Sequence, residues 1–368
     1  MARKKVTVIG AGIVGASIAY RLAQNPEVDV QSIDTSTPGG GTSSASMAWL
    51  NASNKRPRDY FDLNFAGVRE YDKLKSELAA DWLHLTGTLA QAAFTPNLEQ
   101  RAAELEEWGY RVEKTDAATA LGKHLPQARI ADPGEFVAHY PDEGWIDTNG
   151  ATRELIGAAA ACGAEYQQGC GVTRIDREGS AYRLTLADGT TFLTDVVVNA
   201  AGPKADRVAA LVGRHLSLAP TKGMTIKFYA PDIDIDKIVL SDQVEVRPDV
   251  NGCVRTHADA VDGVMAQGAA TDRTELIALM REKAARFLPI LESAPIAGVF
   301  MGIRPIPEDQ FSCVGAVDGI DNYFEAVTHS GVTMGPLIGR LITEYIVNGT
   351  KNELLTSRFD PNRFNDLS

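Results

Sequence analysis

A glycine-rich turn between an apolar strand and a helix constrains this chain more than any other feature. In the stretch from Val6 to Gly15, β-branched residues precede glycines 10, 12 and 15, which have the spacing G-x-G-x-x-G. In such a pattern Gly10 permits a tight turn, Gly12 lets the backbone approach a pyrophosphate, and Gly15 lets the helix pack closely on the strand. A helix predicted from Ile13 to about Ala23 would direct its free N–H groups and positive dipole end at the phosphates.

An acidic residue follows where a ribose ligand is expected. A second predicted strand, 28–33, leads to Asp34, about 20 residues past the glycines, where a carboxylate can accept hydrogen bonds from a ribose diol. Because strand, glycines, helix, strand and acid occur in this order, the sequence predicts a dinucleotide site. The alternative is a structural α/β unit without a ligand.

Length and charge narrow the class of protein. A chain of 368 residues suggests two domains, or one domain with another inserted. The net charge of −12 argues against nucleic acid and anionic membranes as partners, since both require basic patches. We find no apolar run long enough to span a membrane. The four cysteines, Cys162, Cys170, Cys253 and Cys313, have no metal-ligand spacing, so we predict no metal site, free thiols and a cytoplasmic location.

A polar, glycine-rich segment, 35–46, comes directly after Asp34. Its composition favours a flexible surface loop. Its position next to the ribose acid makes it a candidate second phosphate clamp, with hydroxyl groups from Ser43 or Ser44.

The remaining pattern divides into α/β and β-rich parts. Helices are predicted at 58–80, 99–108, 115–125 and 148–162, with a β-hairpin around Asp188-Gly189 and an apolar strand at 195–199. From 216 to 300 the pattern becomes β-rich, with strands at 224–229, 244–247, 252–257 and 296–301 and one helix at 274–287. The end returns to α/β, with a strand at 323–327 and a helix to about 347.

Four blocks of this sequence resemble the FAD-dependent amino acid oxidases of the D-amino acid oxidase, glycine oxidase and sarcosine oxidase type. The blocks span nearly the whole chain in the family's order; they are 10–15 with Asp34, 41–46, 171–175 with 198–202, and 302–305 followed by Gly315 and 328–333. The resemblance implies an α/β fold in which a Rossmann-like FAD-binding domain, at about 1–85, 142–215 and 302–368, carries an inserted β-rich substrate domain, at about 86–141 and 216–301.

The resemblance also implies a role for individual residues. The glycines would hold the FAD pyrophosphate, Asp34 the ribose, and Ser43 and Ser44 the phosphates or ribityl chain. Val172 would contact the adenine, and the helix after Gly331 would stabilise negative charge at the pyrimidine edge of the flavin. The candidate cofactor-binding residues are Gly10, Ala11, Gly12, Ile13, Val14, Gly15, Asp34, Thr35, Thr42, Ser43, Ser44, Val172, Ala200, Ala201, Gly202, Arg304, Gly331, Val332, Thr333 and Met334.

Three positions depart from the family's pattern. Asp34 stands where glutamate is more frequent, which shortens the reach to the ribose. Met301 stands where some relatives carry FAD on a cysteine, so we expect non-covalent FAD. Glu245 falls near the position of a tyrosine that often helps to bind the substrate carboxylate, which puts the usual amino acid substrates in doubt.

Arg304 and His329 are the candidate catalytic residues. By the resemblance Arg304 would clamp a substrate carboxylate through two parallel hydrogen bonds, and its alternative is a surface salt bridge. His329 would face the flavin or substrate, or else be a structural histidine. His257, Arg247 and Arg255 in the β-rich part are candidates for a side chain that points into the pocket, and strand alternation does not decide which. Both arginines are expected at the surface. Lys222 is a candidate cation for oxygen activation or a solvated lysine.

The expected function is oxidation of the C–N bond of a small-molecule amine or amino acid by hydride transfer to FAD, giving an imine that hydrolyses. Two alternatives remain at this point. One is a nicotinamide-dependent dehydrogenase, and the other is a flavin-bearing electron-transfer subunit of a larger complex.

Overall fold

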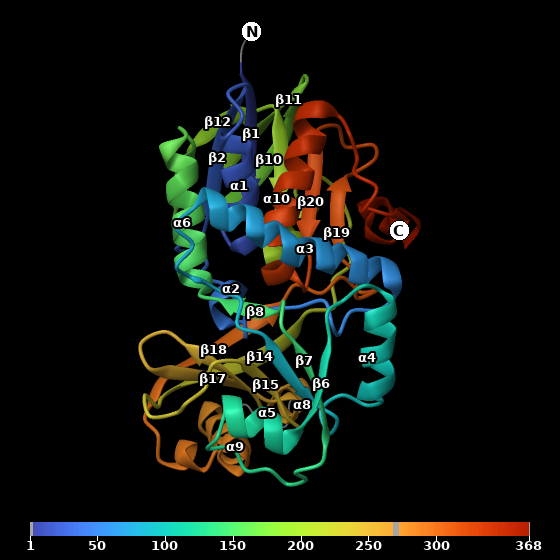
Figure 1. Ribbon diagram of the computed structural model, residues 1–368. Coiled ribbons are helices and arrows are strands. Elements are labelled where there is room, and N and C mark those ends of the chain that lie inside the picture. Colours follow the sequence, from blue (N-terminus) through green and yellow to red (C-terminus); the bar gives the residue numbers. More distant parts are fainter. Residues whose placement is uncertain (1–2, 268–271, 368) are drawn as a thin grey trace.

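Two large β-sheets, one above the other in Figure 1, organise the computed structural model, which describes residues 3–267 and 272–367. The upper sheet has the order β19-β20-β13-β1-β2-β9, and only β19 is antiparallel to its neighbour. Its strands are β1 (Lys4–Ile9), β2 (Val28–Asp34), β9 (Glu165–Gln168), β13 (Val196–Asn199), β19 (Cys313–Ala316) and β20 (Tyr323–Val327).

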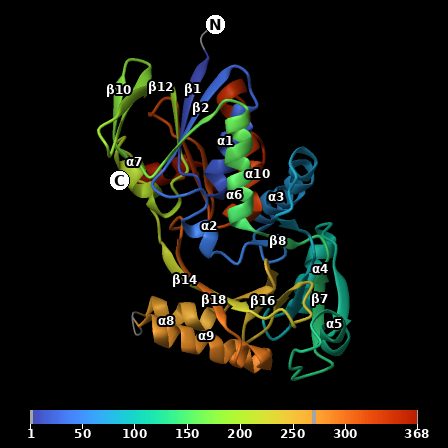
Figure 2. The same ribbon diagram turned by 90° about the vertical axis from the view of Figure 1, so that its left-hand side faces the viewer.

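Helices cover one face of this sheet and a small antiparallel sheet lies on the other (Figure 2). The helices are α1 (Ile13–Ala23), α3 (Arg58–Glu77), α6 (Thr148–Ala161) and α10 (Gly331–Asn348), and the small sheet consists of β10 (Val172–Glu178), β11 (Ala181–Leu186) and β12 (Thr191–Thr194).

Glycines set the position of α10 against its neighbours. A Cβ atom at Gly339 would lie 2.6 Å from the carbonyl oxygen of Ser17 in α1, and one at Gly67 in α3 would lie 2.7 Å from the carbonyl oxygen of Thr333. Both distances are too short for a side chain, so the two glycines allow α1 and α3 to pack closely on α10. This packing holds the N-terminus of α10 near the lower sheet.

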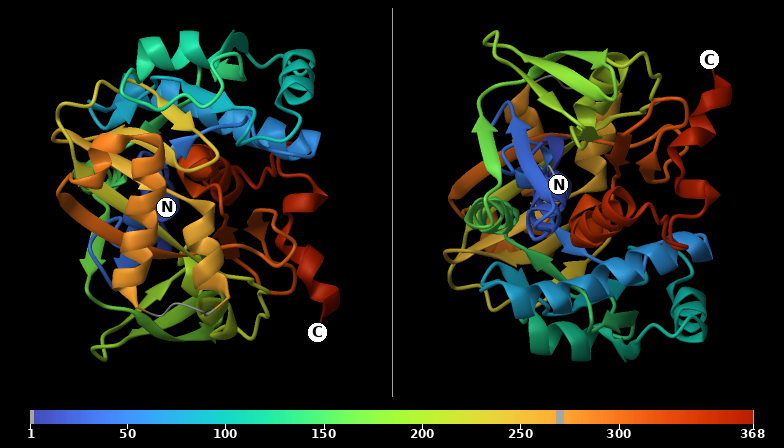
Figure 3. Two further views of the ribbon diagram at one scale, coloured as in Figure 1. Left: turned by 90° about the horizontal axis from the view of Figure 1, so that it is seen from below. Right: turned by 90° about the horizontal axis from the view of Figure 1, so that it is seen from above.

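The lower sheet combines strands from two separate stretches of chain. Its order is β18-β14-β17-β16-β15-β5-β7-β6, and the strands are β5 (Thr88–Gln91), β6 (Glu113–Asp116), β7 (Phe136–Tyr140), β14 (Thr221–Tyr229), β15 (Ile238–Leu240), β16 (Glu245–Asp249), β17 (Cys253–His257) and β18 (Ile296–Arg304). The view from below in Figure 3 shows α8 (Asp259–Ala266) and α9 (Arg273–Phe287), in orange, across this sheet. The other helices of this part are α4 (Leu98–Glu107) and α5 (Ala117–His124).

The remaining elements are short. They are α2 (Thr42–Ala45), α7 (Ala205–Ala210), the sheet of β3 (Trp49–Leu50), β8 (Gly144–Ile146) and β4 (Leu83–His84), and 3-10 turns at Gly202–Lys204, Pro289–Glu292, Ser357–Phe359 and Pro361–Leu367. All four cysteines are free thiols, as predicted. Within the part of the chain that the structure describes, we find no helix long and apolar enough to cross a membrane.

One predicted helix starts later than expected, and one helix was not predicted. The helix predicted at 115–125 begins at Ala117, because Asp116 ends β6 and its side chain accepts a hydrogen bond from the backbone N–H of Thr119 at 2.8 Å. Helix α8 lies in the segment that the pattern left unassigned. Its apolar face is short, formed by Val261 and Met265. Because its first turn is acidic and Gly263 lies inside it, the sequence pattern did not indicate a helix there.

Candidate active site

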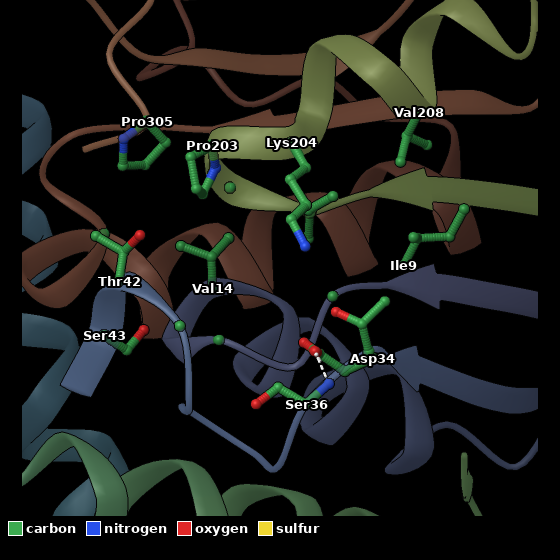
Figure 4. Close-up of a pocket in the computed structure, with 18 of the residues that line it drawn as sticks. Ile9, Val14, Asp34, Ser36, Thr42, Ser43, Pro203, Lys204, Val208 and Pro305 are labelled. Carbon is green, nitrogen blue, oxygen red and sulfur yellow. Dashed lines mark hydrogen bonds between the residues drawn. The ribbon is translucent and has the colours of Figure 1, made fainter. Parts of the chain in front are cut away.

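A cavity of about 550 Å³ lies at the carboxyl ends of β1, β2 and β13. In an open parallel sheet this edge is the usual place for a nucleotide. Figure 4 shows its two walls, with Val14, Asp34 and Ser36 on one side and Pro203, Lys204 and Val208 on the other. The predicted site residues that line it are Gly10, Gly12, Ile13, Val14, Asp34, Thr35, Thr42, Ser43, Val172, Ala200, Ala201, Gly202, His329, Gly331 and Val332.

The geometry of the turn between β1 and α1 explains why glycine occupies positions 10, 12 and 15. Gly10 has a φ of +111°, and a Cβ there would lie 2.3 Å from the carbonyl oxygen of Ala200. A Cβ at Gly15 would lie 1.9 Å from the carbonyl oxygen of Gly10. A Cβ added at Gly12 would have Ser43 Oγ as its nearest neighbour, at 3.2 Å. The backbone of Gly12 therefore faces the cavity beside a hydroxyl group.

The glycine-rich segment after Asp34 is ordered by contacts with the glycine turn. Its residues Thr42–Ala45 form α2, and Ser43 Oγ accepts a hydrogen bond of 3.1 Å from the backbone N–H of Ile13. The hydroxyl of Thr148 donates to the carbonyl oxygen of Ser43 at 2.9 Å. Of the two interpretations of this segment, the flexible loop was therefore wrong, and Ser43 lies at the N-terminus of α1, where an anion would bind.

Asp34 is oriented by backbone groups on either side. Its Oδ2 accepts a 2.6 Å hydrogen bond from the N–H of Ala11 and its Oδ1 a 2.8 Å bond from that of Ser36, the bond drawn in Figure 4. Each carboxylate oxygen can accept more than one hydrogen bond. Asp34 thus remains able to accept bonds from a diol in the cavity.

Two basic residues that line this cavity were not among the residues predicted from the sequence. Lys204 and Arg207 both line it, and the Lys204 side chain points into the space between the walls in Figure 4. Lys204 directly follows Gly202-Pro203 at the end of a predicted strand, so its position in the sequence was a usable signal.

Four candidates line neither this cavity nor the second one. Ala11 and Met334 are fully buried, and Gly15 packs against the turn. Ser44 donates its hydroxyl to the carbonyl oxygen of Gly41 at 2.9 Å. The structure thus places these residues in the framework around the site.

A second cavity, of about 390 Å³, adjoins the first between the two large sheets. The two share Thr42, Ser46, Pro305, His329 and Val332. Arg304 and Thr333 line the second cavity, together with residues of the lower sheet such as Glu245 and His257.

The N-terminus of α10 faces both cavities. Gly331 and Val332 line the first, and Val332 and Thr333 the second. The N-cap Ser330 is held by a 2.9 Å hydrogen bond between its hydroxyl and that of Tyr60, and by a 3.0 Å bond from its N–H to Thr328 Oγ1. The first N–H groups of a helix have no partner inside it, so this end offers fixed donors to a ligand.

Arg304, at the end of β18, is already ion-paired. One Nη atom contacts Asp262 Oδ2 on α8 and lies 3.2 Å from His257 Nε2. A Cβ at Gly223, on the neighbouring strand β14, would lie 2.6 Å from the guanidinium, so glycine at this position gives the guanidinium room where it now lies. Arg304 is therefore oriented before any ligand arrives, and 27% of its side chain remains exposed.

Of His257, Arg247 and Arg255, His257 is the one that lines the second cavity. Its Nε2 lies 2.9 Å from Asp262 Oδ2, and its Nδ1 3.2 Å from Glu245 Oε1. Burial opposes the charged form, but the two carboxylates outweigh it and raise the pKa of His257 to about 10. His257 is therefore an imidazolium at neutral pH.

Arg247 and Arg255 were expected at the surface, and that prediction was wrong. Their exposed fractions are 2% and 6%, and neither lines the cavities. Arg255 donates to Asp249 Oδ2 at 2.8 Å and to the carbonyl oxygen of Ser44 at 3.0 Å, and Arg247 stacks on Trp145. They join the lower sheet to the 44–47 segment. Lys222 is exposed and lines neither cavity.

His329 stands where the cavities meet. His329 is exposed to both cavities. Desolvation by the protein around it, with the positive charges of Lys55 and Arg304, lowers the pKa of His329 to about 4, so its ring is neutral at pH 7. Lys55, which the sequence analysis missed, lines the second cavity, and burial lowers the pKa of its amine to about 8. Among the described residues, the Lys55 amine has neither a hydrogen bond nor an ion pair. No motif surrounds Lys55 in the sequence.

Known proteins match this sequence over almost the whole chain. The family model described as DAO, FAD dependent oxidoreductase, matches residues 5–345. An uncharacterized oxidoreductase, YurR, of Bacillus subtilis is 27% identical, with 97% of this chain and 98% of YurR covered. The glycine oxidase of the same organism is 25% identical, with 95% of this chain and 94% of the enzyme covered.

The fold has solved counterparts. The crystal structure of glycine oxidase from Geobacillus kaustophilus matches with a TM-score of 0.85 at 23% identity and covers 99% of both chains. This likeness confirms the predicted α/β fold class with an FAD-binding fold.

Proposed function

The chain belongs to the DAO family of FAD-dependent oxidoreductases, which act on amino acids or amines, and on this premise we propose that it oxidises a C–N bond of such a substrate by hydride transfer to FAD. The product would be an imine that water hydrolyses. The observation that carries this proposal is the adjacency of the two cavities, one with the features of a dinucleotide site and one containing an oriented arginine. The family match does not support a nicotinamide-dependent dehydrogenase.

The residues of the first cavity fit FAD. The bare backbone of Gly12, the Ser43 hydroxyl and the N-terminus of α1 suit a pyrophosphate, and Asp34 suits a ribose. The N-terminus of α10 would meet the pyrimidine edge of the flavin at the junction with the second cavity. When bound, FAD would supply the acceptor for two electrons and a proton. We propose that it is held without a covalent bond, because the resemblance places Met301 where some relatives have the attaching cysteine.

Arg304 would anchor an anionic group of the substrate. Asp262 and His257 hold one side of its guanidinium and Gly223 leaves it space, so its orientation is settled before the substrate binds. A carboxylate on the exposed side would form charge-assisted hydrogen bonds without reorganising the arginine.

The reacting amine would have to be neutral, because an ammonium has no lone pair to form the C=N bond as hydride leaves. His257 holds its proton too tightly to act as a base at neutral pH, and His329 is too weak a base to hold one. The site would instead favour the neutral amine by removing it from water.

Anaerobic mixing of the purified protein with amines and amino acids tests this function. We expect a yellow protein whose flavin absorbance is lost with at least one substrate. A colourless protein that binds no added FAD would contradict the proposal. A yellow protein that is reduced only with a partner protein present would instead support the alternative of an electron-transfer subunit. The cytoplasmic location stays a prediction.

A further inference from the structure

Two basic side chains face the first cavity from the wall opposite the glycine turn. Lys204 ends the 3-10 turn Gly202–Lys204, and Arg207 follows one helical turn later in α7. Both line the cavity, and Figure 4 shows the Lys204 side chain directed into the space between the two walls. Among the described residues, neither side chain has a hydrogen bond or an ion pair. Two cations thus stand at this site without an anion of the protein as a partner.

A buried asparagine fixes the backbone that carries Lys204. Asn199, the last residue of β13, is fully buried, and its side-chain amide donates a 2.8 Å hydrogen bond to the carbonyl oxygen of Ala205. In the parallel pairing of β13 with β1, Asn199 lies opposite Ile9, the residue directly before the glycine turn. The segment with Lys204 therefore leaves the sheet beside the glycine turn, and Lys204 extends from a rigid base.

The charges around the first cavity are unevenly distributed. Of the described residues that line it, Asp34, Lys204 and Arg207 are charged at neutral pH, since His329 is neutral. The glycine turn and the first turn of α1 offer N–H groups and contain no basic side chain. A dianionic pyrophosphate bound there would lie near Asp34, in a protein whose net charge is −12. Full positive charges to balance it are present on the opposite wall.

We propose that Lys204, supported by Arg207, binds the FAD pyrophosphate from the side opposite the glycine turn. The phosphates would then lie between backbone N–H groups on one wall and two cations on the other. The inference rests on the proposed function for the placement of FAD. A lysine suits this role, because its ammonium is a compact charge on a flexible stem whose N–H donors can rotate toward phosphate oxygens. Both side chains are exposed, so salt should screen the interaction.

Dissociation constants of FAD and ADP for the flavin-free, full-length chain test this proposal. ADP shares the adenosine and the pyrophosphate with FAD and lacks the flavin. We expect Lys204→Met to weaken both ligands by a similar factor, about tenfold, as for a hydrogen bond to a charged group. Lys204→Arg should bind nearly as tightly as the wild type, and the double variant Lys204→Met, Arg207→Met more weakly than Lys204→Met. Lys75→Met, at an exposed lysine of α3 that lines neither cavity, is the matched control.

Ionic strength provides a second readout, which requires neither a variant nor a substrate. The affinity of the wild type for FAD and ADP should fall as the salt concentration rises, and this fall should be smaller in Lys204→Met. Wild-type affinity that does not change with salt, an unchanged affinity of Lys204→Met for ADP, or a loss for FAD alone would overturn the inference.

These measurements separate the inference from the proposed function. If Lys204→Met binds ADP normally while amines reduce the wild-type flavin, the inference alone fails. If binding depends on Lys204 as expected and no amine reduces the flavin, the proposed function alone fails. A wild type that binds neither FAD nor ADP would overturn both.

Discussion

Arg304 and Asp262, which are 42 residues apart in the sequence, form an ion pair at the wall of the second cavity. The arginine ends β18 and the aspartate lies on α8, so the pair joins the edge strand of the lower sheet to the helix beneath it. Although burial opposes its charge, His257 and Arg304 lower the pKa of Asp262, which therefore stays a carboxylate and holds the guanidinium in place.

Arg304→Ala should lose most of the catalytic efficiency on the best substrate. Removing one partner of a buried charge pair costs about 2–5 kcal/mol, which corresponds to roughly 30- to several-thousand-fold in kcat/KM at about 1.4 kcal/mol per tenfold. Steady-state kinetics measures the loss, and flavin content should not change. Arg286→Ala, an exposed arginine of α9 paired with Glu282, is the control. Near-normal efficiency in Arg304→Ala would show that the anchor lies elsewhere.

FAD should be released by acid precipitation. Since Met301 cannot form the covalent bond made by a cysteine, we expect the yellow colour in the supernatant. Colour retained in the pellet would mean that the flavin is attached.

Gly12→Val should be purified without flavin. The first side-chain carbon would already lie 3.2 Å from Ser43 Oγ, and the two methyl groups of valine would occupy the space that we assign to the pyrophosphate. Absorbance spectra of the variant and of Gly109→Val, where nothing lies within 4 Å of an added Cβ, measure this. Gly109 has a φ of +79°, so a valine there strains the backbone but does not block any space. The Gly109→Val variant therefore shows what backbone strain alone does to flavin binding. A yellow Gly12→Val protein would rule out this placement of the cofactor.

Catalytic efficiency should rise with pH and follow the substrate's own amine. If no side chain is an obligatory base, the midpoint of the kcat/KM profile moves with the amine pKa across a set of substrates. Lys55, whose pKa is about 8, is the side chain that could act as a base instead. A midpoint that stays near 8 for every substrate, and disappears in Lys55→Met, would identify Lys55 as a base.

His257 should stabilise the fold in a pH-dependent way. Its pKa rises from the ordinary 6.5 to about 10 in the folded state, so the native state binds the proton more tightly. The contribution is fully present below pH 6.5 and is lost as the pH approaches 10. The stability advantage of the wild type over His257→Gln should therefore shrink over this range in denaturant titrations. His124→Gln is a control of opposite sign, since burial lowers the pKa of His124. A gap that is constant with pH would contradict the assignment.

The nucleotide half of the site was largely determined by the sequence alone. The strand, glycines, helix and Asp34 lie within about thirty residues, and this kind of turn needs glycine at fixed positions for its φ or for close approach, so their spacing alone was informative. The same local logic predicted the extent of α1 correctly. It could not choose between a loop and a clamp at 41–46, because the contacts that order Ser43 come from Ile13 and Thr148.

The substrate half was decided by tertiary structure. Lys55, Glu245, Asp262 and Arg304 come from four distant segments, and no periodicity in the sequence links them. Arg247 and Arg255 look like surface residues by composition, yet the fold buries them with Asp249 and with carbonyl groups of the 44–47 segment as partners. A local pattern records which backbone shapes are possible, whereas the charge on a side chain depends on the groups that folding brings within a few ångströms of it.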